Sequence, residues 1–285
     1  MELTAGETSL ALSAAPADEP VVVFENVGLG FAEGEVLRGI SFQVMPRETK
    51  VLVGETGSGK TLILKLAAGL LRPDAGRVRV LGRELNELGE RELLDFRRQL
   101  GFVFQEGALF DSLSVAENVA YRLREEGVED EEKIEALVRE ALRFVELEDA
   151  IEKLPGELSG GMRRRVSIAR ALMGHPPIVL YDSPTAGLDP VTSQTIITLI
   201  LRLRDLHHVT SLLATHRLQD AFGLANFWFD PAGGRVVPAS RNGGRPQASL
   251  PATTFLVLRD GGVYFEGDQK ALLETSDPYL RGFLV

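Results

Sequence analysis

The feature that most constrains the fold is a glycine-rich turn between a short apolar strand and an apolar helix. It matches the pattern G-x-x-x-x-G-K-[ST], and its residues are Gly54, Glu55, Thr56, Gly57, Ser58, Gly59, Lys60 and Thr61. Glycines let backbone N–H groups converge on phosphate oxygens, and the start of the following helix adds a positive end. We expect Lys60 to reach the β- and γ-phosphates of a nucleotide and the Thr61 hydroxyl to ligate Mg²⁺. A turn that merely connects a strand to a helix is the alternative, which the complete pattern disfavours.

Further along the chain, the apolar stretch PPIVLYDS is expected to be a buried strand that ends in Asp182. A carboxylate at that place can hold a water on Mg²⁺. An aspartate after a strand is usually only a turn former, but its combination with the glycine-rich turn favours the metal role. The residue that follows it is Ser183.

Strands alternate with helices along most of the chain. Residues 21–27 and 36–44 are rich in β-branched and aromatic side chains, which predicts two strands before the glycine-rich turn. After PPIVLYDS come a predicted helix around residues 192–206 and a further predicted strand in VTSLLATH. The alternation predicts an α/β fold with a mainly parallel sheet that helices cover on both faces.

The middle of the chain, from about Leu88 to Gly174, has a helical texture. Within DEEKIEALVREALRFVEL, apolar residues recur at steps of three and four, which predicts one face of an amphipathic helix. These apolar residues are Ile134, Leu137, Val138, Ala141, Leu142 and Val145.

We expect residues 1–20 to form a mobile tail and residues 21–285 to form a single domain. Residues 230–254 are rich in Gly, Pro, Arg and Ser, which predicts an inserted surface loop. The stretch FLVLRDGGVYFEG after it predicts a hairpin whose turn lies around residues 260–262.

The chain carries 31 Lys and Arg residues against 41 Asp and Glu residues, and its formal charge is −10. This balance argues against a general nucleic-acid or anionic-membrane surface, so we expect Arg163-Arg164-Arg165 to be a solvated, ion-paired helix face. The lack of cysteine excludes disulfides and thiolate metal sites. No uncharged apolar run approaches a membrane span and the N-terminus does not look like a signal peptide, so we expect a cytoplasmic protein. We assign no role to His207 and His208, which look like turn residues.

A second anion-binding segment is expected at Leu158–Met162, where the Ser159 hydroxyl and the amides of Gly160 and Gly161 begin a helix. A capped helix with a flexible entry is the alternative. The segment lies about twenty residues before the strand that ends in Asp182. That order resembles the signature region of ABC-type ATPases, and further residues resemble other motifs of the same family.

Three more residues match motifs of ABC ATPases: Gln105 the Q-loop glutamine, Asp189 the D-loop aspartate and His216 the switch histidine. The resemblance covers residues 21–285 and implies a RecA-like P-loop NTPase core, an antiparallel β subdomain and an ABC-type helical subdomain over about residues 105–170. By the same resemblance Phe31 stacks on adenine, with a core Phe as the alternative.

The resemblance implies that ATP and Mg²⁺ are the cofactors. It implies a pair of subunits, in which two ATP molecules lie between one chain's glycine-rich turn and the other chain's Leu158–Met162. The implied catalytic residues are Lys60, Gln105, Asp182, Ser183 and His216, and the implied metal ligands are Thr61, Gln105 and Asp182.

Within that family, residues 101–123, Met162 and the end DPYLRGFLV look like ATPases of Mla/Mce-type lipid-transport systems. This resemblance implies an ATPase at the inner face of the cell membrane that drives lipid or phospholipid transport across the cell envelope. The implied partners are a second copy, a multi-span membrane permease that docks near residues 105–118 and a substrate-binding Mce-type subunit, but no nucleic acid. Apolar contacts for the permease, with core packing as the alternative, would come from Phe104, Leu109, Phe110 and Leu113.

Ser183 stands where ABC ATPases usually carry the glutamate that activates water. A serine hydroxyl does not accept a proton near neutral pH, so we expect weak hydrolysis with intact ATP binding. Use of another carboxylate, an alteration that retains ATP and pairing with a different, competent ATPase subunit are alternatives. An ATP-binding regulatory or scaffolding subunit is a second functional class, and a non-transport ABC protein acting on DNA or ribosomes is a third.

Overall fold

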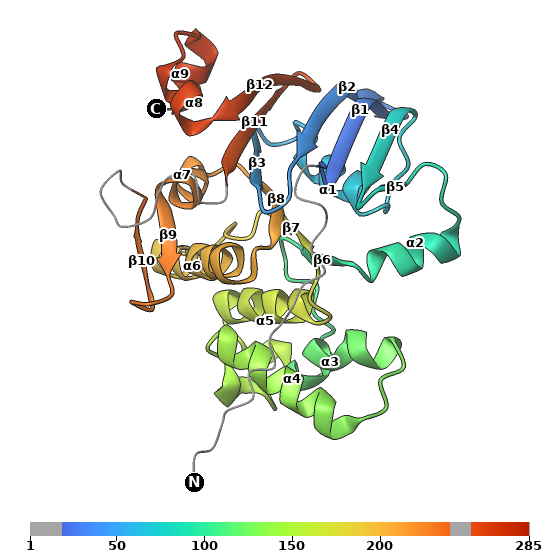
Figure 1. Cartoon of the computed structure of the whole chain (residues 1–285), viewed down its shortest axis with the longest axis vertical. Helices are drawn as coiled ribbons and strands as arrows, with labels where there is room; N and C mark the ends of the chain where they lie inside the picture. The colour runs from blue at the N-terminus through green and yellow to red at the C-terminus, as the bar shows by residue number, and fades with distance from the viewer. Residues whose placement is uncertain (1–18, 240–251, 285) are drawn as a thin grey trace.

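The strands form three sheets in the computed structural model, which describes residues 19–239 and 252–284 (Figure 1). Nearly all of the predicted tail, residues 1–20, lies outside the described residues, as do residues 240–251 of the predicted loop. The largest sheet has the strand order β12-β11-β3-β8-β7-β6. Its strands are β3 (Thr49–Gly54), β6 (Leu100–Val103), β7 (Ile178–Asp182), β8 (Thr210–Thr215), β11 (Thr253–Arg259) and β12 (Gly262–Asp268).

Neighbouring strands from β11 to β6 run parallel, whereas β12 pairs antiparallel with β11. Every residue of β3, β7 and β8 is buried, because helices cover both faces of a parallel sheet. The register pairs Val53 with Thr215 and Asp182 with Ala214. The carboxyl ends of β3, β8 and β7 therefore lie side by side at one edge, which is where such sheets bind ligands.

A second, antiparallel sheet has the order β2-β1-β4-β5 and covers the side of the molecule beside helix α1 (Lys60–Ala67). Its strands are β1 (Val22–Phe31), β2 (Gly34–Val44), β4 (Ala75–Val80) and β5 (Arg83–Glu84). Phe24 of β1, Ile63 of α1 and Leu52 of β3 belong to one hydrophobic core cluster between the two sheets. The two strands predicted before the glycine-rich turn are therefore confirmed, with β1 extending to Phe31.

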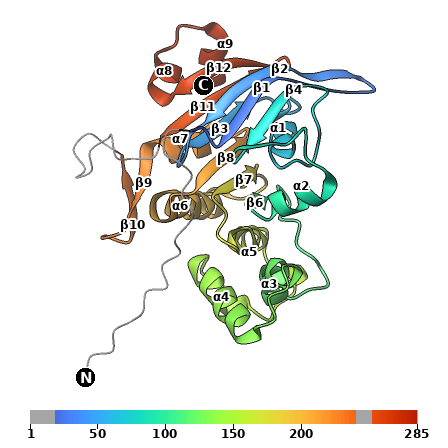
Figure 2. The same ribbon diagram turned by 45° about the vertical axis from the view of Figure 1, so that its right-hand side comes forward.

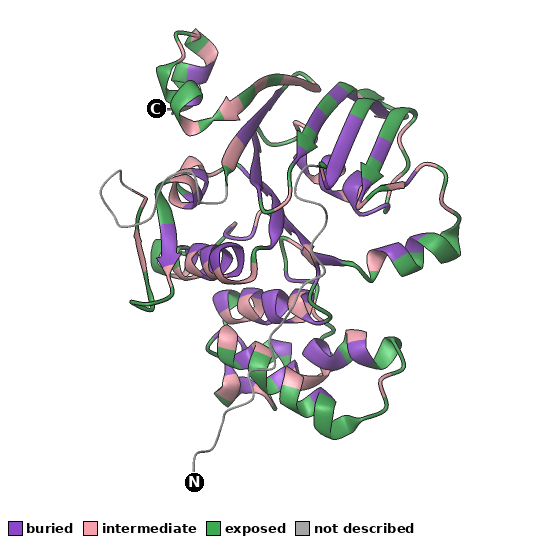
Figure 3. Cartoon of the chain, viewed as in Figure 1, coloured by how far each residue is buried: buried purple, intermediate pink, exposed green. Residues whose placement is uncertain are grey.

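Helices α3, α4 and α5 form a separate layer beneath α6, as the turned view in Figure 2 shows. The helices are α2 (Glu90–Arg97), α3 (Val115–Glu125), α4 (Glu131–Phe144), α5 (Gly160–Leu172), α6 (Pro190–His207) and α7 (Leu218–Asn226), with two 3₁₀ turns at Glu148–Ala150 and Pro155–Glu157. The predicted amphipathic helix is α4: Ile134, Val138 and Leu142 are buried against α3 and α5, and Figure 3 shows the exposed residues on its outer side. The central sheet, the antiparallel sheet and this helical layer confirm the predicted fold class.

The last part of the chain adds a two-stranded sheet of β9 (Phe227–Asp230) and β10 (Arg235–Pro238), then β11, β12, α8 (Gln269–Glu274) and α9 (Pro278–Leu284). Residues 230–254 are thus not a loop throughout: Val236 pairs with Phe229, and Thr253 already belongs to β11. The short β-branched run in β10 is hidden in the sequence by the surrounding glycines. The predicted β11–β12 hairpin is confirmed, and the positive φ angles of Asp260 and Gly261 suit a tight hairpin turn.

Among the described residues, none of the helices combines the length and the apolar character that crossing a membrane requires.

Candidate functional site

The glycine-rich turn lies between β3 and α1, at the carboxyl edge of the central sheet. Helix α1 begins at Lys60, and no side chain caps it at Gly59. Its first N–H groups therefore point outward without a capping side chain, as at other helix starts that bind anions. Gly59 has a φ of +96°, and a Cβ there would lie 2.4 Å from Leu37 Cδ2. Only glycine fits at this position, so the turn conformation depends on it.

The Lys60 side chain is 8% exposed and folds back over the turn. Its Nζ donates to the Gly54 carbonyl at 2.8 Å, to the Glu55 carbonyl at 2.7 Å and to Ser58 Oγ at 3.3 Å. Burial lowers the pKa of Lys60, and the nearby Asp182 carboxylate opposes that shift. The ammonium group is thus held directly beside the turn. Phosphate oxygens would be stronger acceptors for it than these neutral carbonyls.

Asp182, at the end of β7, is 7% exposed and accepts a hydrogen bond from Thr61 Oγ1 at 3.1 Å. The structure therefore brings together two of the three implied metal ligands, Thr61 from α1 and Asp182 from β7. One carboxylate and one hydroxyl are hard oxygen ligands, a set that suits Mg²⁺, because Mg²⁺ usually keeps waters and binds substrate phosphates through few protein ligands. Lys60 and the start of α1 thus suit the phosphates of ATP, and Thr61 and Asp182 suit its Mg²⁺.

Ser183 follows Asp182 and is fixed by its backbone. Its N–H donates to the Ala214 carbonyl of β8 at 2.9 Å, and its own carbonyl accepts from Ala186 N at 3.0 Å. Its φ is +47°, in the left-handed region that non-glycine residues rarely adopt. The Ser183 hydroxyl lies 3.5 Å from Asp182 Oδ1. Position 183 thus directs a hydroxyl, and no carboxylate, toward the edge where Lys60 and Asp182 meet.

Gln105 and His216 follow β6 and β8, and both side chains are exposed at the same edge of the sheet. Phe31, at the end of β1, is 53% exposed, so the alternative that it is a core residue is wrong. An exposed ring is free to stack on a base, as the resemblance to the family implies.

The start of α5 is capped by Ser159 and packs closely on α6. Ser159 Oγ accepts from Met162 N at 3.2 Å, and a Cβ at Gly161 would lie 2.2 Å from Thr192 Cγ2 on α6. Asp189 caps α6 by accepting from Thr192 N at 3.0 Å, and its hydrogen bonds to Thr192 lower its pKa. Helix α5 packs on α3, α4, α6 and β6, whereas α1 packs on β3, β4, β7 and β8. Residues 158–162 and the glycine-rich turn thus belong to different layers of one chain.

The prediction of a solvated, ion-paired face at residues 163–165 is wrong. Arg164 is 5% exposed, and its Nη1 donates to the Phe104 carbonyl at 2.7 Å. Burial lowers the pKa of Arg164, while the carboxylates of Glu106 and Asp182 raise it. Arg163 and Arg165 also donate to backbone carbonyls, and no ion pair among the described residues involves any of the three. These guanidinium groups donate hydrogen bonds to backbone carbonyl oxygens that would otherwise lack a donor.

The loop after β6 is held from both sides. From α5, Arg170 donates to the carbonyls of Gly107 at 2.9 Å and Ala108 at 2.7 Å. From α3, the fully buried Asn118 accepts from Phe110 N and donates to three carbonyls of residues 110–114. The sequence did not predict that Arg164 and Arg170 hold this loop through its carbonyls. The available signal was that Arg164 lies three and four residues before Ser167 and Ile168, on the buried face of α5.

Of the four residues predicted to contact a permease, Phe110 is 42% exposed and its ring lies 4.5 Å from that of Tyr121. Phe104, Leu109 and Leu113 are half-buried. Phe104 stacks on Phe102 with ring centroids 4.1 Å apart, and Leu109 packs against the core. Phe104 and Leu109 therefore make packing contacts within the chain, whereas Phe110, beside Tyr121, is exposed.

Comparison with known proteins agrees with this geometry. The chain matches the family described as ABC transporter over residues 37–186. A dimeric ATP-binding cassette solved in a post-hydrolysis state with ADP and Pi superimposes with a TM-score of 0.72 at 29% identity, covering 87% of this chain and 98% of that one. The fold and the site define a nucleotide-binding cassette of the ABC class.

Three curated relatives show its neighbours within that class. The probable ribonucleotide transport ATP-binding protein mkl of Mycobacterium leprae is 34% identical over 92% of this chain and 69% of its own length. The intermembrane phospholipid transport system ATP-binding protein MlaF of Haemophilus influenzae is 34% identical over 75% of this chain and 82% of its own. The methionine import ATP-binding protein MetN of Rhizobium johnstonii is 36% identical over 87% of this chain and 69% of its own length. The chain spans 63% of the length of the mkl proteins of two further mycobacteria.

The chain therefore belongs to the ABC transporter family as an ATP-binding subunit, and it is an ABC-type ATPase that resembles the Mla-type proteins.

Proposed function

We propose that this chain drives the movement of phospholipids or related lipids across the cell envelope. The observation that carries this proposal is the 34% identity to MlaF over 75% of the chain. The likeness of residues 101–123 and Met162 to Mla/Mce-type ATPases supports it. In this function the chain would bind a multi-span permease through the loop after β6, at the inner face of the cell membrane. An Mce-type subunit would present the lipid.

The residues of this chain would share the work of binding Mg-ATP, which supplies the phosphoanhydride bond whose cleavage drives transport. Lys60 and the first N–H groups of α1 hold the β- and γ-phosphates, because a buried ammonium and a helix start both favour anions. Thr61 and Asp182 hold the metal together with Gln105. Phe31 stacks on the adenine.

Two copies of the chain would complete each site. Residues 159–161 begin α5, which packs on other elements than α1 does, so in a homodimer the N–H groups of this helix start would close over the γ-phosphate bound to the second copy. Asp189 would line that contact, and His216 would orient the attacking water. The dimer would close when ATP binds and reopen after phosphate release, and the permease would follow these motions.

We further propose that Ser183 makes hydrolysis slow. General-base assistance typically contributes about 10²–10⁴-fold to a rate, and a serine hydroxyl does not supply it near neutral pH. The neighbouring carboxylates have other partners: Asp182 accepts from Thr61, and Glu106 faces the charge of Arg164. Positioning and charge stabilisation remain, and these supply most of the catalysis of phosphoryl transfer. Tight ATP binding with weak turnover follows.

Transport by the reconstituted complex tests the substrate. The chain is purified with its membrane partner, placed in phospholipid vesicles and supplied with Mg-ATP, and transfer of a fluorescent phospholipid is followed over time. The proposal predicts ATP-dependent transfer that the Lys60→Ala complex lacks. Transport of methionine or a ribonucleotide, with no lipid transfer, would contradict it.

The nature of position 183 also favours a second candidate, an ATP-binding regulatory or scaffolding subunit that needs no hydrolysis. That function predicts that a non-hydrolysable ATP analogue supports the full activity of the complex. Lipid transport predicts that the analogue arrests the complex after at most one cycle.

A further inference from the structure

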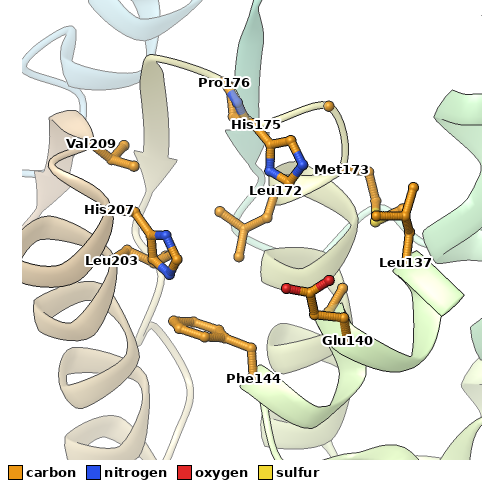
Figure 4. Close-up of a pocket in the computed structure, with 12 residues that line it drawn as sticks. Leu137, Glu140, Phe144, Leu172, Met173, His175, Pro176, Leu203, His207 and Val209 are labelled. Carbon is orange, nitrogen blue, oxygen red and sulfur yellow. The ribbon is translucent and has the colours of Figure 1, made fainter. Parts of the chain in front are cut away.

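A pocket of about 190 Å³ opens between α4, the end of α5 and the end of α6 (Figure 4). None of the residues assigned to ATP, metal or the permease lines it. Its walls come from both the helical layer and the core, because α4 belongs to the first and the end of α6 leads into β8 of the second. An occupant would therefore touch both layers.

The interior of the pocket is apolar. Its main lining side chains are Leu137, Ala141, Phe144, Leu172, Met173 and Leu203. A cavity of about 150 Å³ with similar walls holds one benzene molecule in another protein. The interior thus suits an apolar body of about one ring.

The polar groups of the pocket are Glu140, His175 and His207, and Figure 4 shows all three side chains turned toward the same space. The His207 ring also meets the edge of Phe144, with centroids 5.7 Å apart. The three groups stand on different segments, namely α4, the turn after α5 and the last turn of α6. They can therefore converge on one polar group of a bound molecule.

The nearby arginines already have partners. Arg202 lies 4.5 Å over the Phe144 ring and 3.7 Å from a Glu146 oxygen, and Arg122 pairs with Glu126 at 2.9 Å. Glu140, in contrast, takes part in no ion pair among the described residues. The pocket thus combines an apolar interior with a carboxylate that forms no ion pair among the described residues, although Arg143 on the same helix interacts with it electrostatically.

The imidazoles add hydrogen-bond acceptors. Burial lowers the pKa of both His175 and His207 from 6.5. Arg122 lowers the pKa of His175 further; His175, Arg202 and His208 lower that of His207; and Glu140 opposes the shift in both. These lowered pKa values favour the neutral form of both rings, in which each ring offers one unprotonated nitrogen.

We propose that this pocket binds a small organic amine whose apolar body is about one ring in size. The ammonium group donates to the Glu140 carboxylate and to an unprotonated imidazole nitrogen, and the ring contacts Leu137, Phe144 and Leu203. Glu140 is exposed to solvent, and a charge-assisted hydrogen bond to its carboxylate favours the cation over a neutral or anionic molecule of the same shape.

Three compounds of nearly the same shape test the charge: benzylamine, benzyl alcohol and benzoate, titrated into the full chain and followed by protein NMR. We expect benzylamine to bind at least ten times more tightly than benzoate, with shifts centred on Ala141 and His207. Lowering the pH until the imidazoles become protonated should weaken benzylamine binding, because their new charges repel the ammonium group.

Two variants and a control separate the ring from the charge. Glu140→Gln should remove the preference for benzylamine and leave benzyl alcohol binding unchanged, whereas Glu132→Gln, in the first turn of the same helix, should change neither. Ala141→Leu should fill the pocket and abolish binding of all three compounds, with Mg-ATP binding retained as proof of folding. Benzoate binding as tight as benzylamine binding, no benzylamine binding at millimolar concentration, or an unchanged preference in Glu140→Gln would each overturn the proposal.

Discussion

At the carboxyl edge of the central sheet, the turn after β3 can be compared with the turn after β7. The first offers Lys60 as a buried cation, an uncapped helix start and a hydroxyl already hydrogen-bonded to Asp182. The second offers Asp182 for a metal but continues with a serine, whose backbone is fixed by Ala214 and Ala186. In the proposed function, phosphate binding and water activation are separate parts of this site, and the turn after β7 brings a hydroxyl, not a carboxylate, to the second.

The largest expected effect is a gain. Ser183→Glu should raise the rate of ATP hydrolysis by about 10²–10⁴-fold, because it supplies a general base next to Asp182. Steady-state phosphate release by the purified permease complex measures it. Ser183→Gly is the matched control, since glycine adopts the φ of +47° without strain and brings no carboxylate. Fast hydrolysis by the parent enzyme, with little gain in Ser183→Glu, would show that the turn after β7 does not lack a group for water activation.

Loss of the buried cation should act on the other turn. Lys60→Ala should weaken Mg-ATP binding by about 10- to 100-fold, because hydrogen bonds to charged groups typically contribute about 1.5–3 kcal/mol. Calorimetry measures the affinity, and Lys65→Ala, in the last turn of α1, is the control. Unchanged heats of binding in Lys60→Ala would show that the glycine-rich turn does not hold the phosphates.

The loop that carries Gln105 should respond to a change in α5 behind it. Arg164→Met leaves the half-buried Phe104 carbonyl without its donor, which should lower the free energy of unfolding by about 2 kcal/mol. We also expect hydrolysis to fall by more than ATP affinity does, because Gln105 loses its support while Lys60 does not. Denaturant unfolding and calorimetry measure the two effects. The exposed Arg143→Met is the control, and equal losses in both variants would contradict this role of Arg164.

The smallest expected effect concerns the base of the nucleotide. Phe31→Ala should weaken ATP binding by about 2- to 10-fold through loss of one stacking contact, and Phe31→Tyr should restore it. The same change should leave binding of inorganic triphosphate unaltered, since that ligand has no base. Equal weakening for both ligands would mean that Phe31 supports the glycine-rich turn and does not stack on adenine.

Local patterns in the sequence predicted the parts of the fold that depend on neighbours along the chain. The glycine-rich turn, the apolar face of α4 and the hairpin around Asp260 each show a period or a turn signal within a few residues. The order of motifs then identified the family. The roles of individual site residues in catalysis stay predictions.

What the sequence did not predict depends on contacts between distant segments. Arg164 lies 60 positions from Phe104, so the carbonyl that compensates its burial is invisible in the run of arginines around it. Strand β10 was hidden because its partner β9 supplies the pairing that its short, glycine-flanked run does not signal. His207, given no role from the sequence, lines a pocket only because α4 and α5 end beside α6.

Slow hydrolysis of tightly bound ATP is tested by the state of the nucleotide on the native chain. The chain is mixed with Mg-ATP, the protein is separated from free nucleotide at intervals, and its oligomeric state and its ratio of bound ATP to ADP are measured together. We expect a dimer that retains mostly ATP over many minutes. Rapid conversion of the bound ATP to ADP, or a chain that stays monomeric and free of nucleotide, would contradict it.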